Sequence, residues 1–83
     1  MLIYIIWNNG KTHDLINMDN VTDIERYERI LNFHYANKMG MDYKFNTAEE
    51  AKKAMHDIAS AYMKDEKLIV IVPSITAKHY NFD

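Results

Sequence analysis

The chain has 83 residues, of which 48% are apolar and 27% charged, and its formal net charge is −2. This composition is that of a globular protein, so it excludes an intrinsically disordered or collagen-like chain, and the length suits one small domain, which we take as 1–83. Ten lysine and arginine residues against twelve aspartate and glutamate residues provide no basic surface for nonspecific nucleic-acid binding.

The first predicted element is a β-hairpin. Residues 2–7 form an apolar run rich in β-branched and aromatic side chains, which favours a strand. Asn9 and Gly10 follow this run, and Asn-Gly is the strongest short hairpin signal because both residues tolerate the positive φ of a type I′ turn. Residues 11–16 are then the returning strand, and their weaker alternation is typical of an edge strand with one face in water.

The segment 22–39 fits either a helix or a strand. A capping box and a stripe of apolar residues at helical spacing fall within it: Thr22, Glu25, Ile24, Tyr27, Leu31 and Tyr35. The competing interpretation is a strand at 31–35 that pairs with a strand at 41–45, because both segments alternate well. Phe33 falls on the polar side of the helix, which counts against that helix. We favour the helix, ended by Gly40, and keep the strand as the alternative.

The second half of the chain gives a clearer pattern. Thr47 and Glu50 form a capping box, and the helix that they open has one apolar stripe: Ala51, Ala54, Met55, Ile58, Ala61 and Tyr62. Residues 68–72 are continuously apolar and stop at Pro73, which predicts a strand buried on both faces. The segment 74–83 is expected to be a flexible tail or a short edge strand.

These elements predict an α+β fold. It contains an N-terminal hairpin and a mixed sheet of about four strands, with one or two helices packed on it. The strands at 2–7 and 68–72 are apolar on both sides, whereas the helix after Thr47 covers only one face. An apolar face left without cover on so small a domain would be an association surface.

No catalytic, cofactor or metal site is expected. The chain has no cysteine, so it has no thiolate ligand, thiol nucleophile or disulfide, and this suits a cytoplasmic location. The four histidines, His13, His34, His56 and His79, are scattered over different elements, and zinc would need three or four convergent ligands. Both glycines, Gly10 and Gly40, have turn or cap duties, so no phosphate-binding loop is available. No apolar run is long enough to span a membrane.

By elimination, we expect a non-enzymatic module that binds another protein, with a homodimer as one form. Trp7 is the expected interface anchor, and an acidic group is expected to steer the partner: Asp14, Asp19, Asp23, Glu25 and Glu28. In its composition the chain is similar to small proteins of AT-rich phages and mobile elements, which suggests an inhibitor or modulator of a larger host protein. The alternative is a nucleic-acid or nucleotide binder that uses sheet aromatics with Lys44, Lys52 and Lys53.

Overall fold

The computed structural model describes residues 1–37 and 39–73, and it places six strands and one helix in this part of the chain. The strands are β1 (Leu2–Trp7), β2 (Thr12–Asn17), β3 (Val21–Tyr27), β4 (Ile30–Tyr35), β5 (Gly40–Lys44) and β6 (Leu68–Ile71). The helix is α1 (Ala48–Met63), and two short 3₁₀ turns are η1 (Asn8–Gly10) and η2 (Met18–Asn20). The α+β class is confirmed, with more strands than the four expected. The tail prediction for 74–83 lies outside the described residues.

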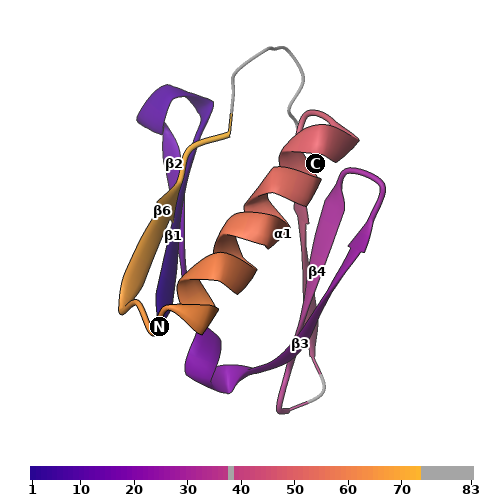
Figure 1. Ribbon diagram of the computed structural model, residues 1–83. Helices are drawn as coiled ribbons and strands as arrows, with labels where there is room; N and C mark the ends of the chain where they lie inside the picture. Colours follow the sequence, from indigo (N-terminus) through magenta and orange to yellow (C-terminus); the bar gives the residue numbers. More distant parts are fainter. Residues whose placement is uncertain (38, 74–83) are drawn as a thin grey trace.

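The strands form two sheets that face each other (Figure 1). One sheet has the order β2-β1-β6, in which β1 is antiparallel to β2 and parallel to β6, and the other is the antiparallel meander β3-β4-β5. The core between them is built from inward side chains of both sheets, of α1 and of the segment between β5 and α1: Ile3, Ile5, Ile16, Leu31, Phe33, Phe45, Ala51, Ala54, Ile58 and Ile71.

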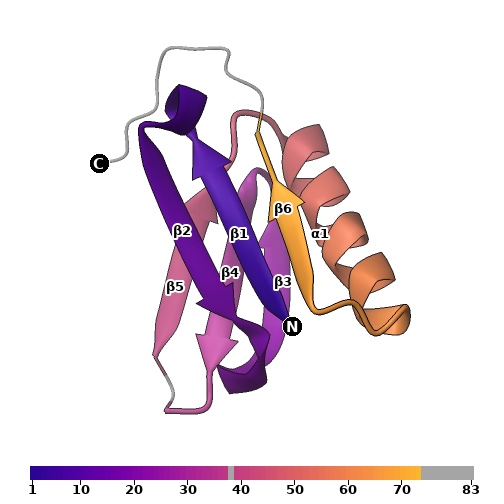
Figure 2. The ribbon, with the colours of Figure 1, turned by 90° about the vertical axis from the view of Figure 1, so that its left-hand side faces the viewer.

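The helix α1 closes one side of the space between the sheets (Figure 2). It packs against β3, β4 and β6, and its buried face is made mostly of small side chains, Ala51, Ala54 and Ala61, which let it approach closely. Thr47 caps the helix as predicted, since its Oγ1 accepts the Glu50 N–H at 3.1 Å. No described helix lies over the opposite side, between β2 and β5 (Figure 2).

The hairpin prediction is confirmed down to its turn. The Lys11 N–H donates to the Asn8 carbonyl at 3.1 Å, which brackets Asn9 and Gly10 as the two central residues. Asn9 has φ 60° and ψ 31°, and Gly10 has φ 85°, as a type I′ turn requires. Lys11 leads into β2, which is an edge strand as expected.

Replacing Gly10 with valine should lower the free energy of unfolding by about 1–2 kcal/mol, because a β-branched residue resists positive φ. A Cβ at this position would meet nothing within 4 Å, so the cost is one of backbone conformation alone. The matched control is Asn8→Gly, at φ 52°, which should leave stability unchanged or slightly higher. Urea denaturation of both variants checks this, and equal midpoints would show that the turn tolerates valine.

The predicted helix over 22–39 is wrong. This segment forms the hairpin of β3 and β4, and Gly40 begins β5 rather than ending a helix. The alternative, in which 31–35 pairs with 41–45, is confirmed by the antiparallel register of β4 and β5. The alternation of Leu31 and Phe33 decides the outcome, because both side chains are fully buried on the inner face of the sheet.

The expectation that 68–72 is buried on both faces is also wrong. In β6, Ile71 points inward and is buried, whereas Leu68 is 49% exposed and Val70 is 53% exposed. The apolar run is therefore that of a strand with one face in the core and one face uncovered. The physical reason is that α1 lies on the inner side of this sheet, and no other helix of the described residues covers its outer side (Figure 1).

Candidate functional site

The outer face of the β2-β1-β6 sheet is the most unusual surface of the described chain. Successive strand residues point to opposite faces, so Ile3 and Ile5, which point into the core, put their neighbours outward. The register then aligns the outward residues of the three strands: Leu2, Tyr4 and Ile6 on β1, His13, Leu15 and Asn17 on β2, and Leu68 and Val70 on β6. We call this surface the aliphatic face.

The aliphatic face is open to solvent and carries no Asp, Glu, Lys or Arg. Leu15 is 63% exposed on β2, and Val70 is 53% exposed on β6, with the half-buried Tyr4 between them on β1. The Tyr4 hydroxyl is hydrogen-bonded to His13 Nδ1 at 2.8 Å, so the polar end of the Tyr4 side chain already has a partner within the chain. Figure 2 looks onto this face, and no described helix or strand lies in front of it.

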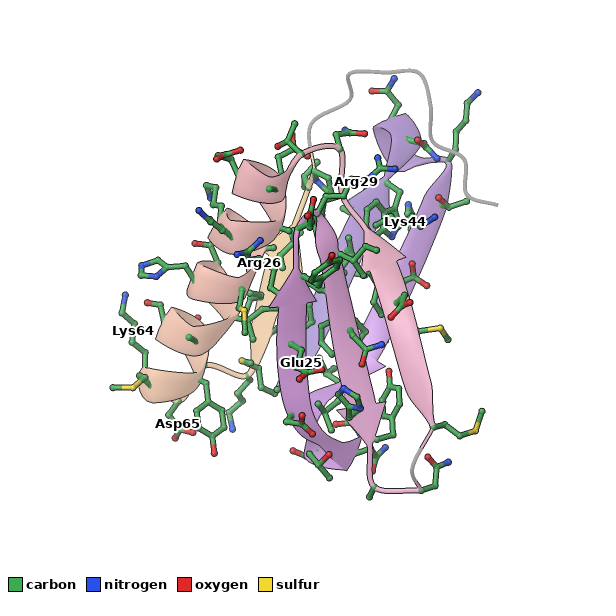
Figure 3. The ribbon with its side chains drawn as sticks, turned by 90° about the vertical axis from the view of Figure 1, so that its right-hand side faces the viewer. Glu25, Arg26, Arg29, Lys44, Lys64 and Asp65 are labelled. Atoms are coloured by element: carbon green, nitrogen blue, oxygen red, sulfur yellow. The ribbon has the colours of Figure 1, made fainter. Side chains whose placement is uncertain are left out.

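The outer face of the β3-β4-β5 sheet, seen in Figure 3, serves as an internal comparison. Its outward positions are mainly polar: Glu25, Asn32, His34, Asp42 and Lys44. His34 Nε2 lies 3.2 Å from a Glu25 carboxylate oxygen, and the Asn32 side-chain amide donates to Asp42. The two outer faces therefore differ in polarity. The outward side chains of the β3-β4-β5 sheet are mainly polar, as is usual for a solvated sheet face, whereas those of the aliphatic face are mainly apolar.

A second feature is a cleft on the open side of the sandwich, where β2 and β5 come opposite each other. It has a volume of about 440 Å³ and is lined by Trp7, Asn8, Thr12, His13, Asp14, Asp42, Tyr43 and Lys44. Trp7 and Asp14 lie on the inner face of one sheet, and Tyr43 lies on the inner face of the other. The cleft therefore combines aromatic rings with charged side chains at the border of the core.

Trp7 contacts three other residues in and beside this cleft, Asp14, Tyr43 and Phe45. Its indole Nε1–H donates to Asp14 Oδ2 at 2.7 Å, and its ring lies almost parallel to Tyr43, with 6.4 Å between centroids and 10° between planes. A tilted contact with Phe45, at 5.2 Å, joins the indole to the core. Trp7 is thus half-buried between the sheets, as expected for an indole beside the hairpin turn, and its role as an interface anchor stays a prediction.

Tyr43 lines the same cleft and is also half-buried. Burial raises the pKa of its phenol well above the ordinary value of 10.0, and the neighbouring Tyr35 and Asp14 add to the rise. The ring also meets Phe33 edge-on, with 5.3 Å between centroids. The phenol therefore stays neutral over the physiological pH range and can act only as a hydrogen-bonding group or a ring surface.

The structure brings only part of the expected acidic group together. Asp14 lies in the cleft beside Trp7, while Asp19 and Asp23 line a separate groove of about 490 Å³ between α1 and the start of β3. Glu25 lies on the outer face of β3 next to His34, and Glu28 lies in the β3–β4 turn. The acidic residues are therefore spread over several surfaces of the molecule.

The basic residues are equally dispersed. Figure 3 shows Arg26 on β3 on the side of α1, Lys44 at the end of β5 across the sheet, and Lys64 next to Asp65 at the far end of α1. Lys52 and Lys53, which the nucleic-acid alternative pairs with Lys44, lie on α1. Phe45 is buried, and the rings of Trp7 and Tyr43 lie between the sheets. Lys44 lines the cleft with Trp7 and Tyr43, whereas Lys52 and Lys53 lie on α1, so the three lysines do not share one surface with the rings.

Over 1–37 and 39–73, no three histidine, aspartate or glutamate side chains lie close enough to hold a metal ion. The single helix of that part of the chain is too short and too polar to cross a membrane. No family model matches the chain, and neither the curated proteins nor the solved structures contain a significant match. The aliphatic face and the cleft are therefore the candidate functional surfaces of the described chain.

Proposed function

We propose that this protein is a non-enzymatic protein-binding module that uses the aliphatic face as its binding surface. The observation that carries the proposal is the exposure of Leu15, Leu68 and Val70 on a sheet face that no described element covers. Contiguous apolar surface in water marks sites of protein–protein contact. Covering these half-exposed side chains would contribute roughly 1 kcal/mol each, about half the value of full burial. Since the chain has no cysteine, we place this activity in the cytoplasm.

The occupant that we propose for this face is a second copy of the chain. Because the face bears no Asp, Glu, Lys or Arg, a twofold pair brings no like charges of these residues together. Sheets stack face to face about 10 Å apart with interdigitated side chains, and half-exposed leucine and valine side chains suit that arrangement. A strongly charged partner would gain nothing from such a surface.

The size of the face sets the expected strength of pairing. With neighbouring strands about 4.8 Å apart, β1 and β2 about 20 Å long and the four-residue β6 about 13 Å long, the patch is roughly 250 Å² in projection. Specific stable interfaces bury about 800 Å² of accessible surface on each partner, so this pair belongs to the weak and reversible class. We expect a dissociation constant on the order of 10–100 µM.

Sedimentation equilibrium on the full chain over about 10 µM to 1 mM tests the proposal, since this range brackets the expected constant. Val70→Lys and Leu15→Lys should each weaken pairing at least about tenfold, because each places two buried ammonium groups in the interface. Both positions are more than half exposed in the single chain, at 53% and 63%, so folding should tolerate lysine there.

Tyr27→Lys is the matched control. Tyr27 is a 73% exposed apolar ring on the outer face of the other sheet, so the chemical change is similar but the location differs. We expect this variant to pair like the original chain. A chain that stays monomeric across the whole range, or a dimer that both aliphatic-face variants leave intact, would remove the support for this proposal.

A further inference from the structure

The carboxylate of Asp14 is in an unusual position. It lies on the inner face of an edge strand directly opposite Ile5, which is fully buried, and it is itself half-buried. From the described residues it accepts one hydrogen bond, donated by the Trp7 indole, whereas a carboxylate can accept about four. None of the ion pairs within 1–37 and 39–73 includes Asp14. A partly desolvated anion of this kind favours a cation beside it.

The rest of the cleft defines the shape and charge of that cation. Trp7 and Tyr43 present nearly parallel aromatic rings, and rings of this kind attract cations to their faces. The charged residues of the lining are Asp14, Asp42 and Lys44, which leaves a net charge of −1, two carboxylates against one ammonium. One further positive charge therefore balances the cleft, and an anionic ligand is disfavoured.

We propose that this cleft binds the guanidinium group of an arginine side chain in a peptide or protein. Guanidinium is flat, so it stacks on aromatic rings, and its N–H groups pair with a carboxylate in the same plane. The Asp14 oxygens left free by the indole are the acceptors, and Trp7 and Tyr43 supply the stacking surface. An ammonium group is a compact point charge that stays strongly hydrated and gains less from the rings.

This inference goes beyond the pairing of two copies and does not depend on it. The cleft lies at the open side between β2 and β5, whereas the aliphatic face lies on the outside of the β2-β1-β6 sheet. Arginine binding can therefore fail while pairing holds, and pairing can fail while arginine binding holds. The strand β2 borders both surfaces, so one partner can contact them together.

Trp7 is the only tryptophan of the chain, so its fluorescence reports directly on the cleft. The probe is N-acetyl-arginine amide, titrated into the full chain at constant ionic strength, with N-acetyl-lysine amide and free L-arginine as parallel arms. We expect a saturable change with the arginine amide and binding of the lysine amide weaker by about fivefold or more. Free arginine binding more tightly than the amide would identify the free amino acid as the ligand and overturn the assignment to a peptide side chain.

Asp14→Asn should weaken binding of the arginine amide about tenfold, because it removes the charge and keeps an oxygen for the indole N–H. Lys44→Gln should strengthen binding, since it removes a competing positive charge from the lining. The matched control is Asp57→Asn, on α1 where it pairs with Lys53 at 2.9 Å, which should bind as the original chain does. No saturable response, equal responses to the arginine and lysine amides, or unchanged binding by Asp14→Asn would overturn the proposal.

Discussion

Replacing Phe33 with alanine should lower the free energy of unfolding by about 3–5 kcal/mol, the cost of removing a large aromatic side chain from a well-packed core. Phe33 is fully buried on the inner face of β4 and meets Tyr43 edge-on. Because the helix expected for 22–39 puts Phe33 on its polar side, that helix would lose little from the same change. The stability of this variant therefore distinguishes the β3–β4 hairpin from the helix expected for 22–39.

Tyr27→Ala is the control for Phe33→Ala, because the helix and the hairpin predict opposite orders of stability loss for the two variants. Tyr27 belongs to the apolar stripe of the expected helix, but it is 73% exposed on β3. The hairpin predicts a loss below about 1 kcal/mol for this variant, as is usual at exposed positions. Guanidinium denaturation at low temperature measures both changes, and a larger loss for Tyr27→Ala than for Phe33→Ala would contradict the hairpin.

Replacing Ile58 with alanine should cost about 2–5 kcal/mol. Ile58 is 3% exposed and is the largest of the buried side chains on α1, whose other buried residues are alanines. Its loss leaves a cavity where the helix closes the side of the sandwich. The same denaturation measurement gives this value.

Thr47→Ala and His56→Ala calibrate the effect at Ile58. The Thr47 variant should cost about 1 kcal/mol through loss of the N-cap hydrogen bond to Glu50. His56 is exposed on the same helix, so its variant should change stability by about 0.5 kcal/mol or less. A cost at Ile58 no larger than that at Thr47 would contradict the packing of α1 between the sheets.

The elements with strong local signals could be predicted from the sequence. Asn9-Gly10 specifies a type I′ turn, and Thr47 specifies a helix start that the structure confirms. The β3–β4 hairpin has no comparable signal. Its two-residue turn is Glu28-Arg29, without glycine or asparagine, and Glu28 adopts φ 55°. Local preference opposes that conformation, so tertiary packing of Leu31 and Phe33 decides the structure there.

Part of the cleft follows from the hairpin register. Trp7 pairs with Thr12 across the turn, which puts Asp14, two residues further, on the same face of the sheet as the indole. The approach of Tyr43 depends on the packing of two separate sheets, which no local pattern encodes. The apolar runs at 2–7 and 68–72 predicted surplus apolar strand surface, but only the strand register shows that Leu15, Leu68 and Val70 lie together on one face.

The central claim is that the aliphatic face binds a second copy of the chain, and isotope-filtered NMR on a mixed sample tests it most directly. One half of the molecules carries ¹³C-labelled methyl groups and the other half is unlabelled, at a concentration above the expected dissociation constant. Face-to-face pairing predicts intermolecular contacts from the methyl groups of Leu15, Leu68 and Val70 and none from those of Ile30 on the other outer face. Intermolecular contacts confined to residues outside the aliphatic face, or no such contacts at all, would contradict the account.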